Sequence, residues 1–156
     1  MKISRELPQF DDERVLLLAV SSHNAVFYEA GDGKITKVGA FKIPNRQYSD
    51  REGFFKTRSS RSPGVIRSGS TYEPMKHEIV RETLRKTADE LKKFYKPSDL
   101  SQIIIFCPSH IHTVVENSLP VLYRRKVSRV IKGNYHDLHP FELLKKVGGR
   151  SRQIKK

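Results

Sequence analysis

One stretch decides the fold of this chain: Leu100-Ser101-Gln102-Ile103-Ile104-Ile105-Phe106-Cys107-Pro108. From Ile103 to Cys107 every residue is apolar, and Pro108 ends the run. A short run of β-branched and aromatic residues between chain breakers is typical of a strand that is buried on both faces of a sheet. We therefore expect a central strand here, with helices covering both faces.

The segments around this strand predict the remaining elements. A long amphipathic helix begins at Pro74 and ends before Pro97, because its apolar residues recur at three- and four-residue steps. Further strands are expected over 14–20, 25–30, 34–42 and 127–132, and further helices over 109–119 and 141–147. The first three strands form an antiparallel meander, because the Gly31-Asp32-Gly33 turn suits a hairpin. The predicted fold is a single α/β domain with a mixed sheet, whose first strand lies beside the parallel strand at Ile103.

The length of 156 residues suits one domain. Residues 1–13 are polar and are predicted to be a lead-in segment. The folded domain is predicted over 14–147, with a long basic loop over 43–73, and the last segment, 148–156, is a basic tail.

The net charge narrows the class of partner. The 30 Lys and Arg residues outnumber the 17 Asp and Glu residues, which gives a net charge of +13 and attracts polyanions. No apolar run approaches the roughly 20 residues of a membrane span, and no signal peptide is visible. The single cysteine cannot form an internal disulfide. These features favour a cytoplasmic protein that binds RNA rather than membrane.

The loop over 43–73 is the first candidate for RNA binding, because it combines positive charge with aromatic rings that can stack on bases. The predicted phosphate contacts are Arg46, Arg51, Lys56, Arg58, Arg61 and Arg67, and the predicted stacking residues are Tyr48, Phe54 and Phe55. A second basic group precedes the last strand and comprises Arg124, Arg125 and Lys126. The alternative is a solvated insert in which Phe54 and Phe55 pack back onto the sheet.

Cys107, His110 and His112 are the candidates for catalysis, because they follow the central strand where α/β sheets commonly place ligands. A thiol beside an imidazole could act as a nucleophile, and Cys with two His could hold zinc. The pattern favours a binding protein over an enzyme, because a cysteine that ends an apolar strand is commonly a small buried hydrophobe. Glu29 is the only acid in the first three strands. No metal or cofactor is predicted.

Several segments together resemble a known family. They are 15–20, Ala25-Val26-Phe27-Tyr28 with Gly31, Lys76-His77-Glu78, Ile103-Ile104-Ile105-Phe106-Cys107-Pro108, Tyr135-His136-Asp137-Leu138 and Phe141-Glu142-Leu143-Leu144. Over roughly 14–147 the chain resembles the middle domain of archaeal and eukaryotic peptide-chain release factors. It is similar in particular to the bacterial host attachment proteins, which resemble that domain.

The resemblance implies a binding module without peptide-release chemistry. Release factors carry a Gly-Gly-Gln tripeptide in a loop, and this chain has none; Gly148-Gly149-Arg150 is no substitute because Arg lacks the Gln amide. We expect a non-catalytic RNA-binding or ribosome-associated protein. A hydrolase acting on RNA or a tRNA ester through Cys107 and His110, and a protein-interaction module, stay open as alternatives. An exposed edge strand of the meander could support a homodimer.

Overall fold

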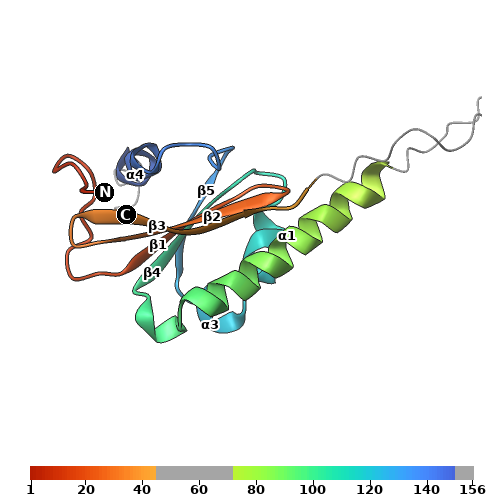
Figure 1. Cartoon of the computed structure of the whole chain (residues 1–156), viewed down its shortest axis with the longest axis horizontal. Helices are drawn as coiled ribbons and strands as arrows, with labels where there is room; N and C mark the ends of the chain where they lie inside the picture. The colour runs from red at the N-terminus through yellow and green to blue at the C-terminus, as the bar shows by residue number, and fades with distance from the viewer. Residues whose placement is uncertain (45–71, 150–156) are drawn as a thin grey trace, which may run out of the picture.

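The structure is a computed structural model that describes residues 1–44 and 72–149. Its helices and strands follow one another in the order expected for an α/β domain (Figure 1). They are β1 (Val15–Val20), β2 (Asn24–Gly31), β3 (Lys34–Lys42), α1 (Tyr72–Phe94), the 3-10 helix η1 (Pro97–Asp99), β4 (Gln102–Cys107), α2 (His112–Ser118), α3 (Val121–Arg124), β5 (Val127–Lys132) and α4 (Pro140–Gly149).

The strands form one mixed sheet of five strands in the order β3-β2-β1-β4-β5. The first three strands are antiparallel neighbours, whereas β1 pairs with β4, and β4 with β5, in parallel. Val15 lies opposite Gln102, and the β1–β4 register continues to Ala19 and Phe106. This arrangement confirms the predicted meander, whose first strand lies beside the parallel strand.

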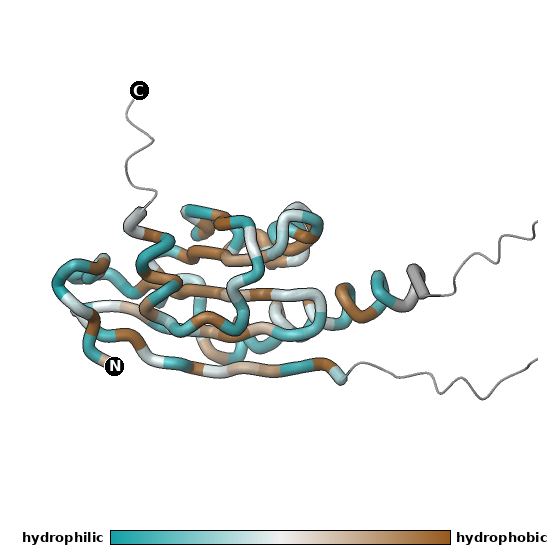
Figure 2. Tube along the Cα trace, turned by 90° about the horizontal axis from the view of Figure 1, so that it is seen from above, coloured by the Kyte–Doolittle hydropathy of each residue, from teal (hydrophilic) through white to brown (hydrophobic). Residues whose placement is uncertain are grey.

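The β1–β4 pair is the most deeply buried part of the sheet. Every residue of β1 is buried, and so is every residue of β4 except Gln102. Successive side chains of a strand point to opposite faces, so the pair supplies two separate cores. The core on the α1 side takes Leu16, Leu18, Ile103, Ile105 and Cys107, and the core on the α4 side takes Leu17, Ala19, Ile104 and Phe106. Figure 2 shows the central strands mostly in the hydrophobic colour.

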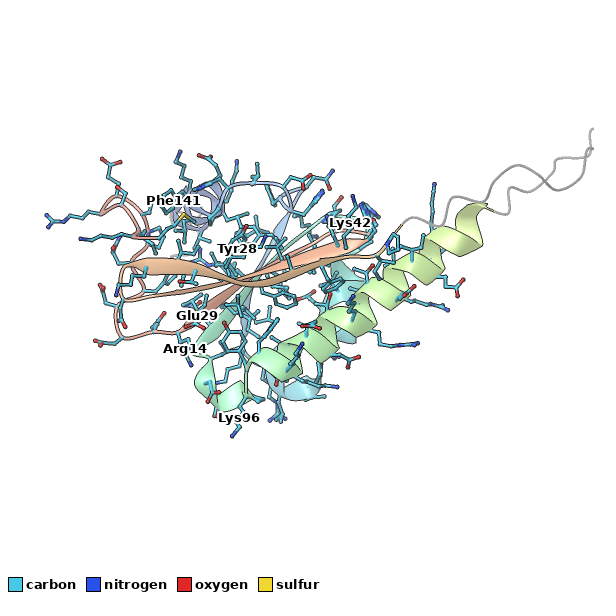
Figure 3. The ribbon with its side chains drawn as sticks, in the orientation of Figure 1. Arg14, Tyr28, Glu29, Lys42, Lys96 and Phe141 are labelled. Carbon is cyan, nitrogen blue, oxygen red and sulfur yellow. The ribbon has the colours of Figure 1, made fainter. Side chains whose placement is uncertain are left out.

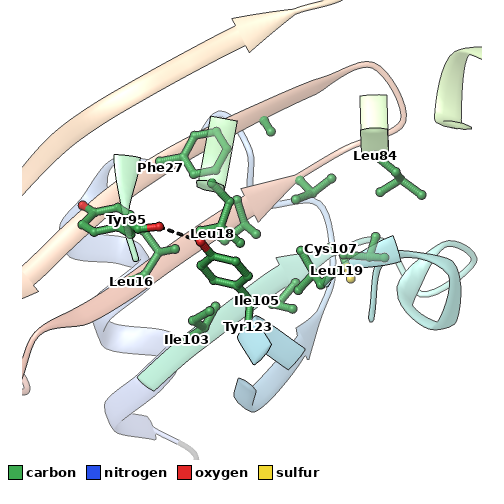
Figure 4. Close-up of a cluster of buried hydrophobic side chains, with 14 of the residues drawn as sticks. Leu16, Leu18, Phe27, Leu84, Tyr95, Ile103, Ile105, Cys107, Leu119 and Tyr123 are labelled. Carbon is green, nitrogen blue, oxygen red and sulfur yellow. Dashed lines mark hydrogen bonds between the residues drawn. The ribbon is translucent and has the colours of Figure 1, made fainter. Parts of the chain in front are cut away.

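The first core lies between the sheet and helices α1, α2 and α3. Leu84 and Leu91 of α1 and Val115 of α2 are buried in it, while the opposite face of α1 carries exposed charges such as Lys92. The alternation of polar and apolar turns along α1 is visible in Figure 2. Tyr123 of α3 closes this core at its lower end, where its hydroxyl donates a hydrogen bond of 2.6 Å to the buried carbonyl of Tyr95 (Figure 4).

The second core lies under α4, and the N-terminal segment contributes to it. Leu143, Leu144 and Val147 of α4 are buried against the sheet. Ile3 is buried in the same core, and Lys2 pairs with Lys34 at the start of the β3 edge. The segment expected as a lead-in therefore packs on the domain. A single apolar residue between Lys2 and Ser4 gives no periodic signal, so the sequence pattern could not reveal this contact.

Three local features differ from the sequence expectation. Residues 97–99 form a 3-10 turn and residues 121–124 form a short helix, and neither was predicted because elements of one turn carry no periodicity. Helix α2 begins at His112 rather than at Ser109. Gly148 and Gly149 are the last residues of α4 rather than the start of the tail. Residues 150–156 lie outside the described residues.

Cys107 ends β4 inside the α1-side core and is fully buried. Burial raises the pKa of its thiol to about 11, with a further rise from the negative charge of Glu116 and a smaller opposing effect of Lys132. The thiol is therefore protonated near neutral pH, which agrees with the expectation that it is a small buried hydrophobe.

None of the helices in the described ranges has the length and apolarity needed to cross a membrane.

We predict that Tyr123→Phe lowers the free energy of unfolding by about 1–2 kcal/mol, because it leaves the buried carbonyl of Tyr95 without its donor. Urea denaturation would measure this loss. Tyr135→Phe is the matched control, since its hydroxyl donates to the Lys132 carbonyl at 3.2 Å in an exposed position where water can replace it. Equal losses in the two variants would contradict the prediction.

We also predict that the Cys107 thiol makes stability sensitive to alkaline pH. Its pKa in the folded protein, about 11, lies above the ordinary value of roughly 8.5 in the unfolded chain. The neutral thiol therefore contributes its full share of the free energy of unfolding below about pH 8.5, and this share is lost as the pH rises through about 11, because the unfolded chain loses the proton first. Between pH 8 and pH 10.5 the free energy of unfolding should fall about 2 kcal/mol further in the wild type than in Cys107→Ala. Urea denaturation at both pH values tests this, and parallel declines would refute it.

Candidate nucleic-acid interface

A pocket of about 500 Å³ lies where β1 and β4 end. Ser22 and His23 follow β1, His110 and Ile111 follow β4, and the first turns of α1 form the remaining wall. The carboxyl ends of neighbouring parallel strands meet at one edge of a sheet, which is where open α/β sheets bind ligands. We call this hollow the α1 pocket.

The polar wall of the α1 pocket is basic. It is formed by His23, Lys76, His77, Arg81 and His110. No carboxylate is found among the described residues that line the pocket. The two cations of this wall, Lys76 and Arg81, attract ions of the opposite sign, and the three imidazole rings offer hydrogen bonds, so the pocket suits an anionic ligand.

The rest of the α1 pocket is apolar. Ile79 and Val80 come from α1, Ile111 directly precedes α2, and Val114 lies in the first turn of α2. Val114 is 48% exposed, so this wall presents an apolar side chain to solvent. An apolar wall beside cationic groups can hold the flat face of a base while its phosphate meets the charges.

The turn that carries His23 is held in place from two sides. The buried Thr83 hydroxyl of α1 lies within donating distance of two carbonyls, that of Ser22 at 3.0 Å and that of Ile79 in its own helix at 2.8 Å. On the other side, the Ile43 amide donates to the His23 carbonyl at 2.7 Å. The turn is therefore fixed to α1 and to the end of β3, so the position of His23 is set by the fold.

The same contacts place both ends of the segment 45–71 near the pocket. Ile43 and Pro44 are the last residues described before this segment, and Ile43 is bonded to the His23 turn. The chain resumes in the first turn of α1, whose Lys76 and His77 line the pocket. The described residues that flank the predicted basic loop are therefore found at this edge of the sheet.

The predicted phosphate-binding and stacking residues of that loop lie outside the described residues. They are Arg46, Tyr48, Arg51, Phe54, Phe55, Lys56, Arg58, Arg61 and Arg67.

The second predicted basic group lies at the other end of the sheet. Arg124, Arg125 and Lys126 come just before β5, whose carboxyl end lies on the pocket side because β4 and β5 are parallel. The Arg124 guanidinium donates to the carbonyls of Asn117 and Leu119, at 2.6 and 3.1 Å, and so closes the end of α2. The structure does not bring this group together with the α1 pocket.

The three catalytic candidates do not form one site, because each has a different environment. Cys107 is buried in the core and its pKa is raised, while His110 lines the α1 pocket. His112 is occupied locally, since its Nδ1 donates to the Ser109 carbonyl at 2.6 Å. Within 1–44 and 72–149 no cluster of three or more His, Cys, Asp or Glu residues is arranged to hold a metal ion.

The one acid of the first three strands serves a structural contact far from the pocket. Glu29 pairs with Arg14 at 3.1 Å and accepts a hydrogen bond of 2.6 Å from the Tyr95 hydroxyl. Burial, together with the Glu29 carboxylate, raises the pKa of Tyr95. Figure 3 shows Arg14 and Glu29 on the side of the sheet away from Phe141 of α4, far along the strands from Lys42.

Sequence reasoning identified His110 but did not assign His23 or Arg81 to a site. His23 follows the first strand and His110 follows the parallel strand beside it, so their positions after neighbouring strands were the available signal. Arg81 gave no such signal, because along α1 it resembles other exposed arginines such as Arg85.

Comparison with solved structures supports the fold. The chain is similar to an archaeal translation termination factor, aRF1, with a TM-score of 0.54 and 12% sequence identity over 90% of this chain and 35% of that one. It is also similar to another archaeal protein, with a TM-score of 0.56 and 11% identity over 90% of this chain and 34% of that one. The chain spans about a third of the length of each of these proteins.

No protein-family model matches the sequence. No curated protein matches it in sequence either. At these identities the solved structures carry the fold alone, and membership of the host attachment group stays a prediction. The single α/β domain, with a mixed five-stranded sheet and a release-factor-like fold, is confirmed.

Proposed function

We propose that this protein is a non-catalytic RNA-binding protein that associates with the ribosome. The observation that carries the proposal is the α1 pocket, in which Lys76, Arg81 and three histidines lie beside an apolar wall, with no carboxylate among the described residues that line it. RNA offers both chemical partners for such a pocket, since its phosphates neutralise cations and its bases have flat apolar faces.

Two further observations support this proposal. The fold resembles part of an archaeal translation termination factor, although the likeness is one of fold alone. The net charge of +13 favours association with a polyanion, and the ribosome is an abundant source of RNA phosphate.

In this proposal the two walls of the α1 pocket bind different parts of the RNA. Arg81 and Lys76 meet phosphates, while Ile111 and Val114 support a base. We further propose that the basic and aromatic residues predicted in the loop over 43–73 add to this contact, since Ile43 is bonded to the His23 turn and Lys76 lines the pocket.

We propose binding rather than chemistry for two reasons. The chain has no Gly-Gly-Gln tripeptide, and the buried Cys107 thiol is held in its protonated form near neutral pH. The hydrolase alternative therefore lacks an activated thiolate nucleophile.

We predict that Arg81→Glu weakens binding of a labelled single-stranded RNA about 10-fold, because it replaces a phosphate contact with a repulsive charge. Fluorescence anisotropy at several salt concentrations would measure this, with the salt slope reduced by about one unit. Arg85→Glu is the matched control, since Arg85 is also exposed, one turn along α1, but does not line the α1 pocket. Equal loss of RNA affinity in the two variants would show that the α1 pocket is not the RNA-binding site.

We also predict that the protein sediments with ribosomal particles from a lysate of its own cells. The association should weaken as salt is raised, because binding to phosphates releases counterions, and ribonuclease should abolish it. Migration as a small free species at low salt would contradict ribosome association.

A further inference from the structure

We infer that the RNA bound by this protein is a single strand that crosses the edge of the sheet, from the α1 pocket to a second basic pocket on the α4 side. The inference rests on the proposed function and specifies the form of RNA and its path.

The second pocket lies over β2 and β3 and has a volume of about 450 Å³. Lys37 and Lys42 of β3 and Tyr28 of β2 line it, and His136 and Asp137 form part of its wall. We call it the β3 pocket. Figure 3 labels Tyr28 and Lys42, which come from neighbouring strands of the sheet.

The β3 pocket has an excess of positive charge. No ion pair among the described residues involves Lys37 or Lys42, and both side chains are exposed. The Asp137 carboxylate, the one acid in the lining, is engaged by the Nε2 atom of His136 at 2.9 Å. The two lysines are therefore available to a phosphate.

His136 lines the β3 pocket, but one of its ring nitrogens points away from it. Its Nδ1 atom is buried and has no hydrogen-bond partner within the described parts of the chain. Because this atom is buried, it does not face the open space of the β3 pocket, and Lys37 and Lys42 are the groups that meet a phosphate there.

The two pockets meet at the turn between β1 and β2. His23 lines the α1 pocket, and its ring centroid lies 6.4 Å from that of His136, which lines the β3 pocket. Asn24, the next residue, lines the β3 pocket and lies opposite Lys42 in the sheet. One pair of imidazole rings therefore separates two basic pockets that belong to opposite faces.

A single strand suits this geometry and a double helix does not. A ligand that enters both pockets must turn round the edge of the sheet, and a duplex is stiff over distances on the order of 100 base pairs. Single strands bend at each nucleotide, and they bind basic grooves with little dependence on sequence. A mononucleotide fills one pocket only, so occupation of both requires several linked nucleotides.

The test compares oligouridines of about 3 and about 12 nucleotides by fluorescence anisotropy. The double variant Lys37→Glu with Lys42→Glu should weaken binding of the longer RNA about 10-fold and change binding of the shorter RNA by less than about 2-fold, because the α1 pocket is intact. The matched control is Lys34→Glu with Lys96→Glu, which makes the same change in charge at exposed lysines outside both pockets. It should weaken both RNAs by less than about 3-fold.

Three outcomes decide between the inference and the function on which it rests. If Arg81→Glu weakens binding and the Lys37 and Lys42 variant behaves like its control, the crossing path is wrong and RNA binding at the α1 pocket stands. If neither variant weakens binding more than its control does, the proposed function fails as well. If a duplex of the same length binds as tightly as the single strand and loses as much affinity in the double variant, the single-strand assignment is overturned.

Discussion

The parallel pairing of β1 with β4 is the constraint on which the rest of the structure depends. Both strands are buried on both faces, so each must be covered by helices on two sides. Helix α1 meets this need on one face and α4 on the other, and the two cores share no side chain. The same pairing brings the ends of the two strands together, so His23 and His110 line one pocket.

The fold could be predicted largely because every residue of its two central apolar runs is hydrophobic. The run from Ile103 to Cys107 and the run from Val15 to Val20 admit no exposed face, and the helical period of α1 is long enough to be unambiguous. The features that the sequence pattern did not predict depend on isolated residues. Ile3 packs on the sheet without apolar neighbours in sequence, and α3 is a single turn shaped by the contacts of Tyr123.

The candidate site was less predictable, since it is assembled from residues that look ordinary in their own segments. Charge indicated an anionic partner, but charge alone could not distinguish Arg81 from Arg85 on the same helix. Arg124 shows another limit: its guanidinium donates to two carbonyls at the end of α2, a contact that its place in a basic triplet does not reveal. His110 was recognised by its place after the central strand, although as a candidate for chemistry rather than for binding.

The position of β4 beside β1 also bears on how the chain reaches its folded state. The hairpins of β1, β2 and β3 form between neighbours in the chain, whereas β1 meets β4 only after the whole of α1 has been placed. Contacts between distant segments slow folding, so we expect the meander to form early and the docking of α1 and β4 to limit the rate. The entropy of closing the intervening segment rises only with the logarithm of its length, about 0.6 kcal/mol for each doubling. The connection between β3 and α1 can therefore lengthen or shorten at little cost in the free energy of unfolding. Its sequence can accordingly change to suit a ligand without loss of the fold.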